Sequence, residues 1–116
     1  MPPSELDLLQ GTLDVLVLRA LSWQPMHGYA IARFIREGSG RTFRILDGAL
    51  YTSLHRMEEK GWVESEWGMS DRGKRAKFYV LTAAGRRALR REASSWERYV
   101  KAVAGVMSAE PEPGTA

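Results

Sequence analysis

The sequence predicts a mainly α-helical protein with a small β hairpin, arranged as a winged helix-turn-helix followed by a long C-terminal helix. Three observations carry this prediction. Three segments with helical periodicity come first, two alternating segments joined by a glycine-containing cationic turn follow, and a seam of apolar residues spaced by three and four comes last. The predicted units are residues 1–81 for the winged helix, 82–107 for the long helix and 108–116 for a disordered tail.

The first helix is expected to begin near Ser4, with Asp7 three residues later, and to end before Pro25. Residues 10–12 either break this helix or restart it. The segment is apolar on nearly every side, which indicates burial on more than one side, one of them against a second subunit. Its stripe consists of Leu6, Leu9, Leu13, Leu16, Val17, Ala20 and Leu21, with Leu8, Val15 and Leu18 on other faces.

The second and third helices are predicted over residues 27–37 and 47–60. His27 is expected to fix the start of the second helix by a hydrogen bond, and Asp47 is expected to be the N-cap of the third. The inward residues of the third helix are predicted to be Leu50, Leu54 and Met57. Its other faces carry small or hydrogen-bonding side chains, which suits contact with a polar partner.

The hairpin is predicted from alternation in residues 62–67, a turn over 68–74 and a second strand over 75–81. Three helices followed by a hairpin with cations at its tip have the layout of a winged helix. A protruding cationic loop can contact phosphates beside the groove that the third helix enters.

Charge and composition narrow the function. The chain has 116 residues, 44% of them hydrophobic, which suits one compact domain. Eight of the 17 basic residues lie within residues 72–91, where there is no acidic residue, so the remainder is net acidic. This distribution is typical of a polyanion-binding protein, the alternative being a solvated arginine-rich helix and turn. Cysteine is absent, which excludes disulfides and thiol nucleophiles, and no segment resembles a membrane span. We expect a soluble cytoplasmic protein.

The last helix is predicted to run from a cap at Thr82 to about Met107, roughly 39 Å at 1.5 Å per residue. Its apolar seam predicts packing on a second copy of the chain, and the alternative is that the helix folds back on its own domain. The expected homodimer interface consists of Leu8, Val15, Leu89, Ala93, Trp96, Tyr99, Val100, Val103 and Met107. Trp96 is either interface core or, with its symmetry mate, one wall of a slot for a small flat hydrophobic or aromatic effector.

Four segments resemble the PadR family of bacterial transcriptional regulators, in order and over nearly the whole chain. They are LLQGTLDVLVLRAL (8–21), PMHGYAI (25–31), GALYTSLHRMEEKGWV (48–63) and GKRAKFYVLTAAGRRAL (73–89). The resemblance implies a dimeric winged helix, usually a repressor, of the short form with one C-terminal helix. It also implies that some members release DNA on binding phenolic acids or flat hydrophobic compounds. Two departures are Thr52, where the family commonly has proline, and Ala76, which interrupts the basic run of the wing.

The predicted function is sequence-specific binding of double-stranded DNA by a homodimer, with repression inferred from the resemblance. The alternative is a winged-helix protein-interaction module. No enzyme activity, metal or cofactor is expected, because His27 and His55 have no partner at ligand spacing and no nucleophile has a base nearby. The residues expected to contact DNA are Ala49, Tyr51, Thr52, Ser53, His55 and Arg56 of the third helix, and Arg72, Lys74, Arg75 and Lys77 of the wing.

Overall fold

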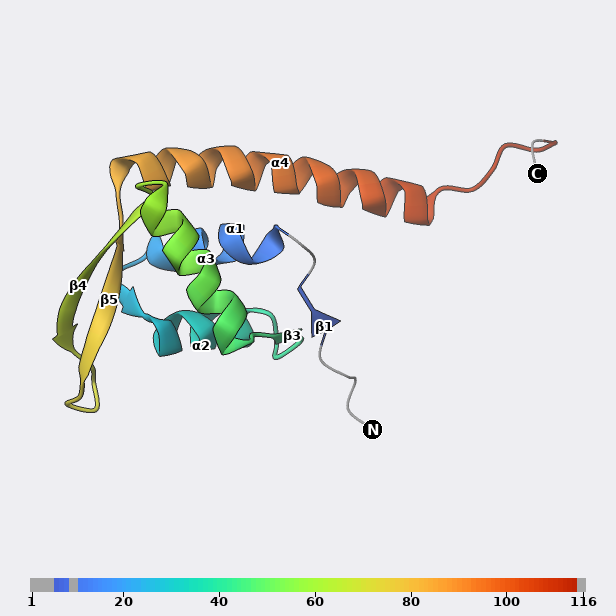
Figure 1. The fold of residues 1–116 in the computed structure, drawn as a ribbon. Coiled ribbons are helices and arrows are strands. Elements are labelled where there is room, and N and C mark those ends of the chain that lie inside the picture. The colour runs from blue at the N-terminus through green and yellow to red at the C-terminus, as the bar shows by residue number, and fades with distance from the viewer. Residues whose placement is uncertain (1–5, 9–10, 115–116) are drawn as a thin grey trace.

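The computed structural model describes residues 6–8 and 11–114, and it confirms the predicted fold class (Figure 1). Helices predominate, and a small antiparallel sheet lies at one end of the helical domain. The elements in chain order are β1 (Leu6–Asp7), α1 (Thr12–Leu21), β2 (Met26–His27), α2 (Gly28–Gly38), β3 (Phe43–Arg44), α3 (Asp47–Glu59), β4 (Val63–Met69), β5 (Arg75–Leu81) and α4 (Ala83–Ser108).

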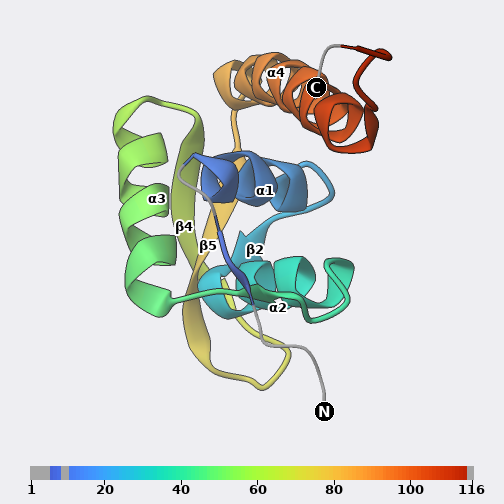
Figure 2. The ribbon, with the colours of Figure 1, turned by 90° about the vertical axis from the view of Figure 1, so that its right-hand side faces the viewer.

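The antiparallel sheet has the order β2-β5-β4, so the strand that leads into α2 borders the hairpin. The β4–β5 ladder pairs Val63 with Leu81 near the helices and Met69 with Arg75 near the tip. In the side view, α1 lies between α4 above it and α2 below it, with α3 alongside (Figure 2). The hairpin continues past the helices and forms the wing.

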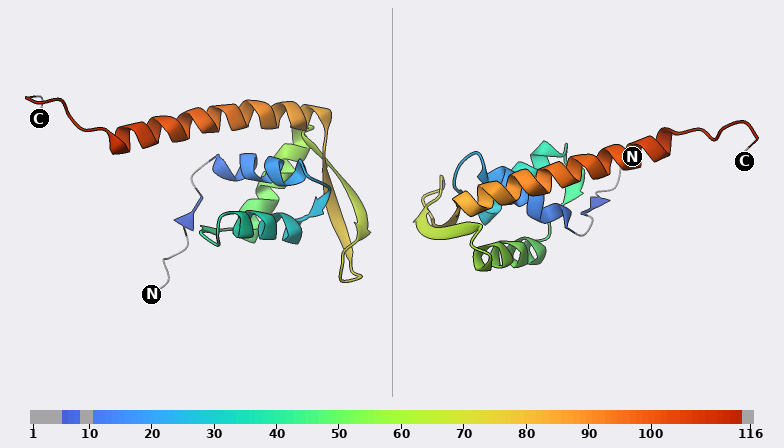
Figure 3. Two further views of the ribbon diagram at one scale, coloured as in Figure 1. Left: turned by 180° about the vertical axis from the view of Figure 1, so that it is seen from behind. Right: turned by 90° about the horizontal axis from the view of Figure 1, so that it is seen from above.

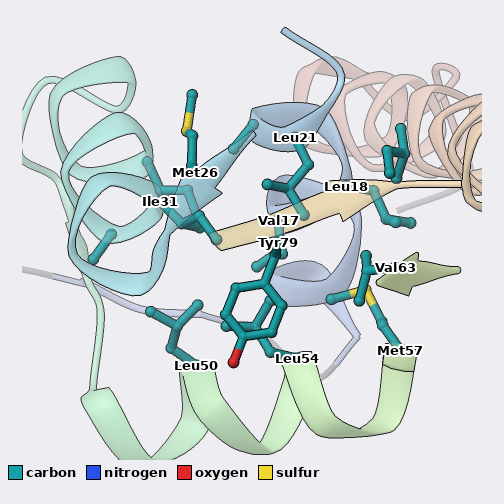
Figure 4. Close-up of a cluster of buried hydrophobic side chains, with 14 of the residues drawn as sticks. Val17, Leu18, Leu21, Met26, Ile31, Leu50, Leu54, Met57, Val63 and Tyr79 are labelled. Carbon is teal, nitrogen blue, oxygen red and sulfur yellow. The ribbon is translucent and has the colours of Figure 1, made fainter. Parts of the chain in front are cut away.

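The core lies where α1, α2 and α3 meet the inner end of the sheet (Figure 4). Leu50, Leu54 and Met57 of α3 are fully buried there, as their spacing predicted. Tyr79 of β5 is also buried and lies among these side chains. This packing fixes the rotation of α3 about its own axis and so determines which of its residues face solvent.

The first helix is shorter than predicted. The stripe was expected to begin at Leu6, but Leu6–Asp7 forms a short parallel bridge with β3, and the Leu6 amide donates to the Thr42 carbonyl at 2.6 Å. Helix α1 begins only at Thr12, because Gly11 has a left-handed conformation (φ 87°) that a helix cannot include. The predicted start at Ser4 lies outside the described residues. The sequence left open whether residues 10–12 break or restart the first helix. In the residues that the structure describes, a helix starts at Thr12.

The caps of the later helices agree with the sequence at two of three positions. His27 precedes α2, and its Nδ1 accepts the Ala30 amide at 3.1 Å, as predicted. Thr82 precedes α4, and its Oγ1 accepts the Gly85 amide at 3.0 Å. The prediction for α3 is wrong by one residue, because Leu46 holds the extended cap conformation and Asp47 is already helical. In the first turn, the Asp47 carboxylate still interacts favourably with the positive end of the helix dipole.

Helix α4 leaves the domain. Its first turns pack on α1 and β5, where Gly85 and Ala88 are buried, and the rest projects beyond the other elements (Figure 3). The predicted end at Met107 is one residue short, since Ser108 is the last helical residue rather than the first of the tail. Residues 109–112 have no regular secondary structure. Folding back is therefore limited to the first turns of this helix.

Candidate nucleic-acid interface

Helix α3 presents an outward face made of small and hydrogen-bonding residues. Ala49, Thr52, His55 and Arg56 are exposed on it, as expected. Ser53 is not, because the residue is only 1% exposed, so its predicted place on the outward surface is wrong. Its position three residues after Leu50 turns it toward α1. The outward face of α3 therefore excludes Ser53.

Ser53 and Arg56 share one acceptor, the carboxylate of Asp14 in α1. The Ser53 hydroxyl and the Arg56 Nη2 both donate to the same Asp14 oxygen, each at 2.6 Å. The side chain of Arg56 nevertheless remains 45% exposed. The guanidinium of Arg56 is thus held through Nη2, while part of the side chain stays open to solvent.

Tyr51 lies across the beginning of α2. A Cβ atom added at Gly28 would be 2.6 Å from the Tyr51 hydroxyl oxygen, so the ring in this position relies on the glycine beneath it. Tyr51 is 44% exposed, so the ring remains partly open to solvent. Its hydroxyl is positioned beside the amino end of α2, where backbone amides favour anions.

A cleft of about 520 Å³ lies between the wing on one side and, on the other, the amino end of α2 together with Tyr51 of α3. Aromatic rings form its apolar surface, and cations surround them. It is lined by His27, Gly28, Tyr29, Arg33, Tyr51, Trp67, Ser70, Asp71, Arg72, Lys74, Arg75, Ala76, Lys77 and Tyr79. The structure thus brings Tyr51 and the four predicted wing cations to one cleft, whereas the other exposed α3 residues lie outside its lining.

The wing tip is held in place by a tight turn and by aromatic rings. The Gly73 amide donates to the Ser70 carbonyl at 2.9 Å, and Gly73 has a left-handed φ of 73°. The guanidinium of Arg72 lies 5.9 Å from the centre of the Tyr29 ring, and that of Arg75 lies 4.8 Å from the Trp67 ring. Cation–π contacts of this kind orient the side chains without neutralising them.

Lys77 is more engaged than the cations at the tip. Its Nζ lies 4.0 Å from a Glu58 carboxylate oxygen and 5.8 Å from the centre of the Tyr79 ring. Burial, and secondarily the charge of Glu58, raises the pKa of the Tyr79 phenol above its ordinary value of 10.0. Tyr79 therefore remains neutral at physiological pH.

The predicted dimer residues fall into three groups. Tyr99, Val100, Val103 and Met107 are exposed on the projecting part of α4, whereas Leu8, Leu89, Ala93 and Trp96 are partly buried. Val15 is only 8% exposed, because α1 is packed against α2, α3 and α4. Its predicted place in the dimer interface is therefore wrong. The Trp96 and Tyr99 rings stack with centres 5.5 Å apart.

Several residues of the site were missed from the sequence. Tyr29 and Trp67 contribute rings to the cleft, and Asp14 organises one side of α3. Asp14 had a detectable signal: a carboxylate in an otherwise apolar helix segment needs a partner. Tyr29 and Trp67 gave no comparable signal, since their role depends on the distance between the wing and α2.

The chain has relatives among transcriptional regulators. The PadR-like family of transcriptional regulators matches residues 17–91, more than half of the sequence, and the chain belongs to this family. The transcriptional regulator Rv3488 of Mycobacterium tuberculosis is 34% identical over 78% of this chain and 80% of its own length.

Two solved structures are similar over most of the chain. A PadR family regulator of Clostridium difficile R20291 has 32% identity and a TM-score of 0.70, covering 85% of this chain and all of that one. The PadR-like regulator BC4206 of Bacillus cereus has 26% identity and a TM-score of 0.75, covering 88% and 97%. In the described ranges, no helix is long and apolar enough to cross a membrane, and no group of three or more His, Asp or Glu residues is placed to bind a metal.

Proposed function

We propose that this PadR-like regulator is a cytoplasmic homodimeric repressor that binds a pseudo-palindromic operator in double-stranded DNA. The observation that carries the proposal is the arrangement around α3. An exposed polar face, including Thr52 and Arg56, stands next to a cleft where Tyr51 and the wing cations gather. Hydrogen-bonding side chains read base edges, and cations neutralise phosphates.

In the proposed complex, α3 enters the major groove and the wing lies along the neighbouring backbone. Arg72, Lys74 and Arg75 at the exposed tip contact phosphates, and Tyr51 donates its hydroxyl to a phosphate near the amino end of α2. Lys77 contributes less, because it also faces Glu58. Ser53 makes no DNA contact, since it is buried.

The dimer is proposed to form through the projecting half of α4. Val100, Val103 and Met107 are exposed there in a single chain, and their spacing of three and four places them on one face. Pairing through this face covers apolar surface that otherwise remains in water. The two α3 helices then meet successive major grooves about 34 Å apart, and an occupied promoter excludes polymerase.

Fluorescence anisotropy tests the proposal. Labelled duplexes from upstream of the protein's own gene are titrated beside scrambled duplexes of equal length at several salt concentrations. We expect salt-sensitive binding that is weaker on scrambled DNA by roughly a thousandfold or more. Equally weak binding to every duplex contradicts sequence specificity, and no binding at low salt favours the protein-interaction module.

Two variants separate base reading from phosphate binding. Thr52→Ala is expected to reduce the difference between native and scrambled duplexes. Lys74→Ala is expected to weaken both alike and to lower the salt slope by about one. Lys101→Ala removes a cation from α4, far along the chain from the cleft, and serves as the matched control for Lys74.

Trp96 fluorescence distinguishes the two roles proposed for that ring, with Trp96→Phe as the blank for the other tryptophans. A change that follows protein concentration alone indicates interface core. Quenching by a planar aromatic compound at constant dimer concentration indicates an effector slot, which the stacked Trp96 and Tyr99 rings support.

A further inference from the structure

Asp14 connects the first helix to the helix that faces DNA. One of its carboxylate oxygens accepts two hydrogen bonds from α3, from the Ser53 hydroxyl and from Arg56 Nη2, each at 2.6 Å. The Asp14 side chain is 20% exposed, and Ser53 is buried. The buried serine therefore anchors the carboxylate, and the anchored carboxylate holds the arginine.

The contact leaves the guanidinium of Arg56 able to bind something else. A guanidinium has five N–H donors, arranged as two edges that each offer a parallel pair. The contact with Asp14 is made through Nη2 alone, and one N–H of that nitrogen suffices for it. One complete edge of two donors remains, on a side chain that is 45% exposed.

We propose that Asp14 is a positioning residue for DNA recognition: it restrains Arg56 so that the free edge of the guanidinium meets a guanine in the major groove. This inference rests on the proposed function. Guanine offers two acceptors, O6 and N7, at the spacing of one such edge. An unrestrained arginine has to lose side-chain freedom on binding, whereas Arg56 has already lost part of it in the free protein.

The charge of Asp14 makes the proposal testable, because a charge effect and a positioning effect change different quantities. A carboxylate near a DNA-binding face repels phosphates, so removing an acid that has no other role strengthens binding to every duplex. If Asp14 positions Arg56, its removal instead weakens discrimination between bases. A charge effect alone therefore leaves the preference for the operator unchanged, whereas loss of positioning lowers that preference.

The experiment compares Asp14→Asn with Glu59→Gln in the full chain. Glu59 is an exposed acid at the end of the same α3 helix, so its removal reports the effect of charge alone. Dissociation constants are measured for the operator and for operators with single base substitutions. The variants Arg56→Ala and Asp14→Asn/Arg56→Ala complete a double-mutant cycle.

We expect Glu59→Gln to leave base discrimination unchanged. Asp14→Asn is expected to lower it by about 2- to 13-fold, the value of ordering one long side chain on binding, and at the base pair that Arg56→Ala also relaxes. In the Arg56→Ala background, Asp14→Asn is expected to cause no further loss. Side-chain ¹⁵N NMR of the free protein should show restricted rotation of the Arg56 guanidinium, which is released in Asp14→Ala because that variant removes the acceptor.

The outcomes separate this inference from the proposed function. If the unmodified protein prefers no duplex, the proposed function is refuted and this inference with it. If the unmodified protein discriminates and both folded Asp14→Asn and folded Asp14→Ala, which leaves Arg56 no acceptor at this position, discriminate equally well, only the inference is refuted, and Asp14 is a tie between helices. If Asp14→Asn does not fold, Arg56→Lys replaces it, because lysine keeps the charge but lacks the two-donor edge; unchanged discrimination then overturns the inference.

Discussion

Replacing Gly85 by alanine tests how α4 is seated on the domain. Gly85 lies in the first turn of α4 and is buried. A Cβ atom there would overlap the carbonyl oxygen of Trp62 and would lie 2.7 Å from Leu81 Cδ1 and 3.0 Å from the Trp62 carbonyl carbon. Because two of these atoms are backbone, the first turn of α4 has to move away from the segment between α3 and β4.

The expected cost follows from opposing effects. Alanine in a helix is favoured over glycine by about 1 kcal/mol. Overpacking costs about 1–3 kcal/mol, and the upper end applies here since a carbonyl group cannot rotate away. Moving the turn also strains the Thr82 cap, whose Oγ1 accepts the Gly85 amide and donates to the Gly61 carbonyl at 2.6 Å. We expect Gly85→Ala to lower the free energy of unfolding by about 2–3 kcal/mol.

Gly105→Ala is the matched control, because Gly105 lies in the same helix and a Cβ atom added there has no described atom outside its helix within 4 Å. It should raise the free energy of unfolding by up to about 1 kcal/mol. Urea denaturation at one protein concentration compares the two variants, since dimerisation makes apparent stability depend on concentration. The reasoning is refuted if Gly85→Ala is as stable as Gly105→Ala.

Three further predictions concern the dimer, the wing and alkaline pH. Val103→Asp should raise the dimer dissociation constant roughly tenfold or more in sedimentation, because it puts a charge into the apolar seam; Ser94→Asp, on another face of α4, should not. Tyr29→Leu removes the ring beneath Arg72, so amide exchange in residues 70–74 should accelerate about two- to fivefold, the value of one exposed cation–π contact; unchanged exchange would contradict this tether. The raised pKa of Tyr79 means that the folded state keeps a proton which the unfolded state loses near pH 10.0, so this tyrosine makes stability fall as pH rises above that value. Tyr79→Phe should show a smaller alkaline loss in denaturation titrations, and equal slopes would exclude the effect.

Local signals in the sequence were sufficient for most of the fold. Thr82 and His27 cap their helices as predicted, because a cap depends on residues three positions apart. The second strand of the hairpin was also predicted correctly at residues 75–81. Trp67 shows where alternation stops being informative: it shares a face with Val63, yet it is exposed because the wing extends beyond the helices.

The error at Ser53 came from giving residue type precedence over spacing. Leu50, Ser53, Leu54 and Met57 occupy positions i, i+3, i+4 and i+7, which is the full pattern of an inward helical stripe. A serine at such a position must find a buried acceptor, and the acceptor is Asp14 in another helix.

That acceptor could not be identified by periodicity, because periodicity reports which side of a helix faces the core and not which polar groups meet there. Asp14 and Arg56 are separated by 42 positions, and their contact depends on how α1 and α3 cross. The same carboxylate that satisfies the buried Ser53 also limits where Arg56 can point. In this chain, a single carboxylate therefore both satisfies a buried polar group of α3 and restrains a residue of the proposed reading face, and a substitution at Asp14 should affect both.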